Sequence, residues 1–143
     1  MLKVKPFIGY SDCETVKLDL DDMSFSRVKE IVIITMNLFN LGGYVILKSS
    51  RNCYHAVFDR NVVWGENVAI MAKVSLMLRF KNPKVLKWFL MQCIKGSSTL
   101  RVTPKNEKPS PRIVYTFGEQ NHAITNFLKE RERIKRIHRS INS

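Results

Sequence analysis

The sequence predicts a mixed α+β fold in which an antiparallel sheet carries its helices on one face. Two runs, 15–22 and 53–59, alternate apolar and polar residues as half-buried strands do. Two longer stretches, 25–41 and 67–94, repeat their apolar residues at the spacing of a helix. With 143 residues, 45% of them hydrophobic and 25% charged, the chain has the composition of one folded domain.

The first half of the chain is expected to form a strand, a helix and a hairpin. The helix covers 25–41, with Ser24 or Ser26 as its N-terminal cap and Gly42 at its end. Residues 44–59 then form the hairpin, because two runs suited to strands flank a polar turn.

The second half begins with a helix over 67–80. Pro83 starts a new helix, because proline suits a first helical position, and Gly96 ends it. Strands at 98–103 and 112–117 and a final helix at 119–141 complete the chain.

The predicted order is therefore β-α-β-β-α-α-β-β-α. Its first six elements, with the helix pair counted as one, form the βαββαβ unit of ferredoxin-like folds. The first and third strands of that unit are neighbours at the sheet centre, and we expect the face without helices to be free for a ligand. The chain is thus predicted to be a single domain, 1–143, with a core over about 15–117 and an added C-terminal basic helix over about 119–141.

The charge distribution indicates a polyanionic partner. The chain has 24 basic and 12 acidic residues, a net charge of +12. Residues 1–66 carry eight of each sign, so residues 67–143 carry sixteen basic and four acidic side chains, and the whole excess lies there. Nucleic acid, either single-stranded DNA or RNA, is the expected partner, although a basic protein can also carry such a charge without binding anything specific.

Several classes of protein are not expected. The apolar stretch 31–47 is interrupted by polar residues and glycines and is too short to span a bilayer, so no membrane partner is predicted. The N-terminal residues do not have the pattern of a secretory signal. Three scattered cysteines form neither a disulfide framework nor a zinc motif, which fits a cytoplasmic, intracellular protein.

Strand alternation brings four chemistry-bearing residues to the expected open face. Asp19 and Asp21 lie one strand step apart, and carboxylates so placed repel each other unless a cation lies between them. His55 and Arg101 point to the same face from the third and fourth strands. A divalent metal, Mg²⁺ or Mn²⁺, on Asp19 and Asp21, with His55 and Arg101 on a triphosphate, would be chemically coherent. A solvated strand face, with Lys17 as partner of the carboxylates, is the alternative.

These residues resemble the motifs of the archaeo-eukaryotic primase (prim-pol) superfamily, whose core is an RRM-like βαββαβ unit. Residues 18–21, Leu-Asp-Leu-Asp, match its first motif of alternating hydrophobic and acidic residues. Ser50 and His55 resemble in spacing its second motif, a serine and a histidine across a short turn, in which Arg51 replaces one of the usual glycines. Members of the superfamily often carry an arginine and a lysine after the later strand, and Arg101 and Lys105 in the run 100–105 look similar. The resemblance implies catalytic roles for Asp19, Asp21 and His55 and phosphate binding by Ser50, Arg51, His55, Arg101 and Lys105.

The third motif of that superfamily, a further acidic residue, has no match. No acidic residue lies between Glu66 and Glu107. The resemblance therefore implies either a metal-dependent nucleotidyltransferase or a relic domain kept for binding nucleic acid or nucleotide, in which case no cofactor is needed.

The C-terminal helix carries the strongest basic run. Its apolar stripe predicts packing at its start, and its cations predict contacts with phosphates. An ordinary solvated helix is the alternative. The predicted nucleic-acid contacts are Arg112, Lys129, Arg131, Arg133, Lys135, Arg136 and Arg139.

Three functions stay open on this evidence. The leading one is a primase-like domain of a replication system, which would bind nucleic acid and a nucleoside triphosphate beside a protein partner. The second is a non-catalytic module for single-stranded DNA or RNA, in which the aspartates are incidental. The third is an adaptor whose basic helix docks on an acidic protein.

Overall fold

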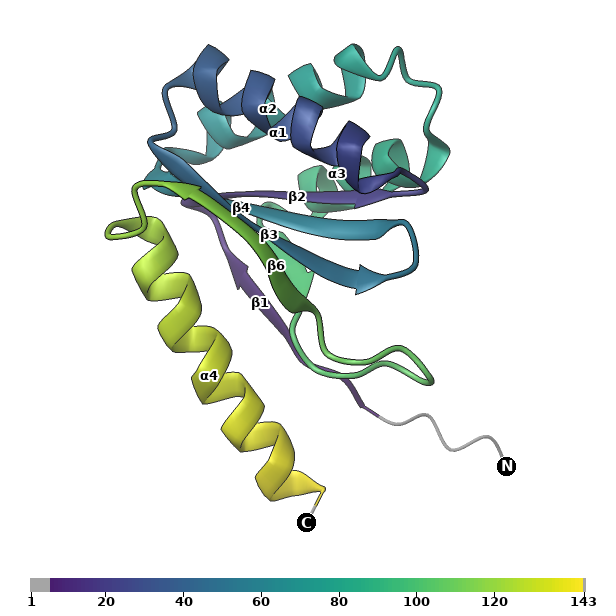
Figure 1. Ribbon diagram of the computed structural model, residues 1–143, viewed down its shortest axis with the longest axis vertical. Helices are drawn as coiled ribbons and strands as arrows, with labels where there is room; N and C mark the ends of the chain where they lie inside the picture. Colours follow the sequence, from purple (N-terminus) through teal and green to yellow (C-terminus); the bar gives the residue numbers. More distant parts are fainter. Residues whose placement is uncertain (1–5, 143) are drawn as a thin grey trace.

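A computed structural model describes residues 6–142 and contains an α+β fold with antiparallel sheets, as the sequence predicts (Figure 1). Its elements, in chain order, are β1 (Gly9–Asp12), β2 (Thr15–Asp21), α1 (Phe25–Phe39), β3 (Gly43–Ser50), β4 (Cys53–Asn61), α2 (Trp64–Met77), α3 (Pro83–Lys95), β5 (Ser98–Arg101), β6 (Arg112–Gly118) and α4 (Ala123–Ile141).

The main sheet has four strands in the order β2-β4-β3-β6, and each pair is antiparallel. The predicted first and third strands of the core, β2 and β4, are indeed neighbours, with Asp19 opposite His55. Helices α1, α2 and α3 cover one face (Figure 1). The alternation of β2 is confirmed, because Val16, Leu18 and Leu20 are buried in the core under these helices.

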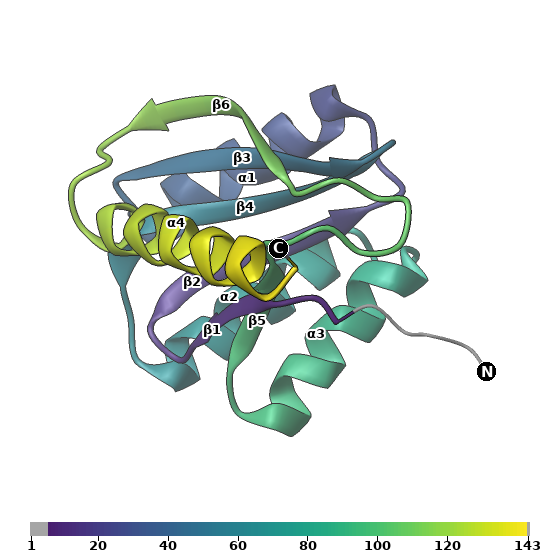
Figure 2. The same cartoon turned by 90° about the horizontal axis from the view of Figure 1, so that it is seen from below.

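The second face of the sheet is not free, and that expectation was wrong. Helix α4 and the β1–β5 pair cover most of it (Figure 2). Val45, Leu47 and Val57 point to this side and pack with Ile124 and Phe127 of α4 in a second apolar core. A sheet that is apolar on both faces needs cover on both, and here the final helix supplies it.

Strand β5 is hydrogen-bonded to β1, a strand that the sequence did not predict. In a ferredoxin-like sheet this fourth core strand would form backbone hydrogen bonds with β2. Here β5 contacts β2, but its backbone hydrogen bonds are with β1. The segment 9–12 is only four residues long, so its sequence carries almost no periodicity. Thr103, just after β5, is fully buried, and its hydroxyl accepts a hydrogen bond from the backbone N–H of Ile8 at 2.7 Å.

Helix ends follow the predicted chemistry with small shifts. Ser24 caps α1, which ends two residues early because Asn40 takes the left-handed conformation that the sequence assigned to the glycines. Asn82 and Gly96 cap α3 at its two ends. Helix α4 begins only at Ala123, because β6 continues to Gly118. None of the helices within 6–142 is both long enough and apolar enough to cross a membrane.

Side chains, rather than a backbone ladder, join β2 to the β1–β5 pair. Lys17 is completely buried, and its ammonium group donates to Asp12 at 2.6 Å and to the Ser98 hydroxyl at 2.9 Å. Burial alone would raise the pKa of Asp12, but hydrogen bonds from Lys17, Thr15 and Tyr10 outweigh it and lower that pKa to about 2. Burial lowers the pKa of Lys17, and Asp12 opposes this change.

We predict that Asp12→Asn destabilises the fold by about 3 kcal/mol, because it leaves a buried ammonium group without its counter-charge. The double variant Asp12→Asn/Lys17→Met removes the buried charge as well and should recover most of this loss. Urea denaturation at pH 7 measures both values. Equal destabilisation of the single and the double variant would show that the ion pair is not what holds the two sheets together.

Candidate functional site

One end of the sheet's second face is left uncovered and forms a pocket of about 190 Å³, which we call the Asp19 pocket. It lies where β2, β3, β4 and β5 meet the loop 102–111. Six residues that the sequence predicted as one site line this pocket together, although they come from four strands and a loop: Asp19, Asp21, Ser50, His55, Arg101 and Lys105.

Four further residues of the pocket were not predicted. Ser49 and Cys53 flank the β3–β4 turn, and Phe7 precedes β1. Lys108 pairs with Lys105 across a tight turn, in which each backbone N–H donates to the other's carbonyl at 2.9–3.0 Å. The sequence did carry a signal for this turn, since asparagine tolerates the positive φ that Asn106 adopts.

Asp19 is the one described residue of the pocket with a buried side-chain oxygen that lacks a hydrogen-bond partner. Its Oδ1 atom is buried and has no hydrogen-bond partner among residues 6–142. The nearest nitrogen of an ionisable group, His55 Nε2, is 3.7 Å away, which is too far for a hydrogen bond. An unpaired buried carboxylate oxygen is costly unless a proton or a cation occupies it.

The electrostatics of Asp19 agree with this geometry. Burial, and then the carboxylate of Asp21, raise the pKa of Asp19 well above its usual value, while Arg101 and Lys108 act in the opposite direction. The charged form of Asp19 is therefore disfavoured when no cation is near. A divalent cation would stabilise that charged form, since carboxylate oxygens are its preferred ligands.

His55 is a neutral imidazole in this environment. Burial, with a smaller contribution from Arg101, lowers the pKa of His55 to about 3. The side chain can donate or accept a hydrogen bond, but it brings no positive charge toward a phosphate. It also adds no repulsion toward a cation on Asp19.

Arg101 holds the loop rather than projecting freely into the pocket. Its Nη1 donates to the carbonyls of Thr103 at 2.7 Å and Pro109 at 2.8 Å, and its Nη2 donates to the Ser49 carbonyl at 3.1 Å. These bonds fix the loop that carries Lys105 and Lys108 against β3. The two lysines, which are exposed, are thus cations that this wall of the pocket offers to a ligand.

The other predicted binding residues lie outside the pocket. Arg51 and Arg112 line a neighbouring groove. On α4, Arg131 is largely buried and its guanidinium donates to the Pro111 carbonyl at 3.0 Å, so it serves packing. Arg133 pairs with Glu130 at the surface. Lys129, Lys135, Arg136 and Arg139 are at least partly exposed along α4.

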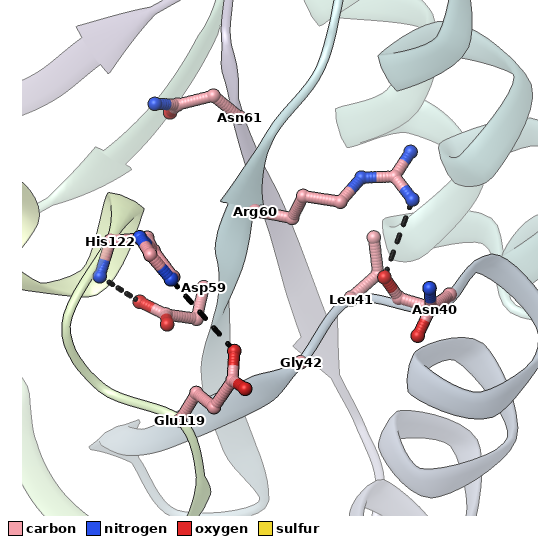
Figure 3. Close-up of a pocket in the computed structure, with 8 residues that line it drawn as sticks. All are labelled: Asn40, Leu41, Gly42, Asp59, Arg60, Asn61, Glu119 and His122. Carbon is pink, nitrogen blue, oxygen red and sulfur yellow. Dashed lines mark hydrogen bonds and ion pairs between the residues drawn. The ribbon is translucent and has the colours of Figure 1, made fainter.

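A second group of possible metal ligands lies at the opposite end of the sheet (Figure 3). One ligand atom each of Asp59, Glu119 and His122 lies within 4.8 Å of the others, beside a cavity of about 480 Å³. Asp59 on β4, however, already accepts hydrogen bonds from the N-terminal end of α4. Its two oxygens accept the backbone N–H groups of Asn121, His122 and Ile124 at 2.9–3.2 Å. This carboxylate is already satisfied, in contrast to Asp19.

We predict that Asp19→Asn stabilises the protein at pH 7 in the absence of divalent metal. Because the pKa of Asp19 is raised on folding, the folded state binds more protons than the unfolded state, and stability falls as pH rises from about 4 through that raised pKa. The stability of Asp19→Asn should not decrease in this way with pH, because asparagine does not ionise. Chemical denaturation of both proteins between pH 4 and pH 8, in a chelator, measures the difference.

The two stability curves should meet near pH 4 and diverge at higher pH. Asp22→Asn is the matched control, since Asp22 is the exposed neighbour that pairs with Lys84 at the surface. A wild-type curve that rises relative to Asp19→Asn over this range would contradict the assignment.

No family model, curated protein or solved structure matches this chain.

Proposed function

We propose that the chain is a primase-like, nucleic-acid-associated domain whose Asp19 pocket binds a divalent cation together with the phosphates of a nucleoside triphosphate. The observation that carries the proposal is the buried Oδ1 of Asp19, which lacks a hydrogen-bond partner within 6–142 and shares the pocket with Asp21. A cation is the ligand that satisfies both carboxylates at once.

The two walls of the pocket have opposite charge. Asp19 and Asp21 form one, and Lys105 and Lys108 form the other, with Arg101 behind them. The carboxylates by themselves would repel a phosphate. A phosphate bound only by the lysines would leave the carboxylates without a ligand. A phosphate bridged to the acid pair by a cation suits both walls.

Asp19 and Asp21 would hold Mg²⁺ or Mn²⁺. When bound, the cation would neutralise phosphate charge and polarise a phosphoryl oxygen. Lys105 and Lys108 would balance the remaining negative charge, and Arg101 would keep them in place through its bonds to the loop. The neutral His55 could donate a hydrogen bond to a phosphate oxygen without competing with the cation.

The resemblance to the prim-pol superfamily supports this proposal through the placement of its motifs. Asp19, Asp21, Ser50 and His55 come from three strands, and all of them face one pocket together with Lys105. If the domain is active, the reaction is phosphodiester formation from nucleoside triphosphates, with release of pyrophosphate.

A non-catalytic binding module is the second candidate, and two observations favour it. Asp19 and Asp21 are the only carboxylates, among the described residues, that line the pocket. Its volume of about 190 Å³ is also below the range of about 300–1,000 Å³ that is usual for enclosing a whole small ligand. In this case the pocket would hold phosphates and a cation, and the bases would lie outside.

A nucleotide-incorporation assay on a single-stranded template with Mn²⁺ separates the two candidates. For a polymerase-type activity we expect Asp21→Asn to lose at least about 100-fold, because it removes a metal ligand. Asp22→Asn, the same change one residue further along and outside the pocket, should retain activity.

Incorporation by Asp21→Asn at the wild-type rate would refute a role for the acid pair. If no protein incorporates nucleotide while the wild type still binds Mn²⁺ and a triphosphate, the non-catalytic candidate is the correct one.

A further inference from the structure

A second depression, of about 370 Å³, adjoins the Asp19 pocket. It runs between the β3–β4 turn and the loop 104–111, and we call it the basic groove. Ser49, Ser50 and Lys108 line both depressions, so the groove is continuous with the pocket.

The groove is strongly cationic. Lys48, Arg51, Lys108 and Arg112 line it, and Glu107 is the one acidic residue in its lining among residues 6–142. They come from the end of β3, the β3–β4 turn, the loop and the start of β6, so the fold gathers them from separate parts of the sequence. Arg51, Lys108 and Arg112 are exposed, which leaves their charges available to a ligand.

The cationic track continues past the groove. A further hollow of about 220 Å³ shares Ser110 with it and is lined by Lys135, His138 and Arg139 of α4. Three adjoining depressions with cations around the same loop suit an extended anion better than a single phosphate group.

We propose that the basic groove binds the sugar–phosphate backbone of a single-stranded nucleic acid whose end lies at the Asp19 pocket. The groove offers serine hydroxyls beside its cations, which is the donor set that phosphate oxygens use. Among the described residues, its lining includes no exposed large apolar side chain that could anchor a peptide. Only the role of the strand's end rests on the function proposed above.

The mouth of the Asp19 pocket favours a single strand over a duplex. The Phe7 ring lines it and is 46% exposed, with the Lys105 ammonium 4.8 Å from the ring centroid. An unpaired base can stack on such a ring, whereas the bases of a duplex already stack on one another.

The test is the binding of a fluorescein-labelled 15-nucleotide oligothymidylate by fluorescence anisotropy, in a chelator, at several salt concentrations. The variant Lys48→Gln/Arg51→Gln/Arg112→Gln removes three groove charges and leaves the residues of the Asp19 pocket intact. Each lost phosphate contact to a single strand lowers the slope of log affinity against log salt by about 0.7, so the slope should fall by about 2. Affinity at 0.1 M salt should fall at least about tenfold.

The matched control is Lys73→Gln/Lys81→Gln/Lys87→Gln, which removes the same charge from exposed lysines of the α2–α3 region. Its affinity should stay within about twofold of the wild type, since long-range charge effects are screened at this salt. Equal losses in the two triple variants, or no binding by the wild type at 0.1 M salt, would overturn the groove as a strand site. The latter result would favour an acidic protein as the partner.

Mn²⁺ titration of the wild type and the groove variant separates this inference from the proposed function. The two proteins should bind Mn²⁺ equally, which also shows that the variant is folded. If the groove charges are needed for oligonucleotide binding but neither protein binds Mn²⁺, the metal site is refuted and the groove is not. If both proteins bind Mn²⁺ but the affinity for the oligonucleotide does not depend on the groove charges, the groove is refuted and the metal site is not.

Discussion

The buried ion pair between Lys17 and Asp12 is the interaction on which the functional end of the molecule depends. Within residues 6–142, no backbone ladder joins the four-stranded sheet to the β1–β5 pair. The Lys17 ammonium bridges them through Asp12 on β1 and Ser98 on β5. Because Asp19 follows Lys17 on β2, and Arg101 follows Ser98 on β5, the same contact sets the distance between the acidic wall of the pocket and the arginine that holds its basic wall.

Much of the fold and the centre of the site could be predicted from local sequence patterns. Strand alternation put Asp19 and Asp21 on one face, and the hairpin turn fixed the side of β4 that carries His55. These features depend on neighbours within one strand or one turn, which periodicity records. The arrangement of α1–α3 over one face of the sheet follows from the same patterns.

What could not be predicted depends on contacts between distant segments. The pairing of β1 with β5 joins residues about ninety positions apart, and segments of four residues have no periodicity of their own. The use of Arg101 as a loop anchor depends on three backbone carbonyls, which no residue pattern identifies. The cover by α4 did leave a signal: Tyr44–Leu47 is a continuous apolar run, which is typical of a strand buried on both faces.

The stability of the pocket and its proposed chemistry oppose each other at Asp19. Burial and the nearby carboxylate make the charged form of Asp19 costly, and the arrangement persists because the surrounding sheet fixes β2. Asp59 at the opposite end shows the contrasting case, since helix α4 satisfies its oxygens with three backbone N–H groups. Of these two carboxylates, the one with a buried oxygen that has no hydrogen-bond partner within 6–142 lines the pocket beside the cationic loop.

Calorimetric titration of the metal-free protein with Mn²⁺ at pH 7 is the measurement that shows whether Asp19 and Asp21 hold a divalent cation. We expect one Mn²⁺ per chain and at least about tenfold weaker binding by Asp19→Asn, because that change removes a ligand. If the wild-type protein binds no Mn²⁺ at millimolar concentration, or if Asp19→Asn binds it equally well, the Asp19 pocket is not a cation site.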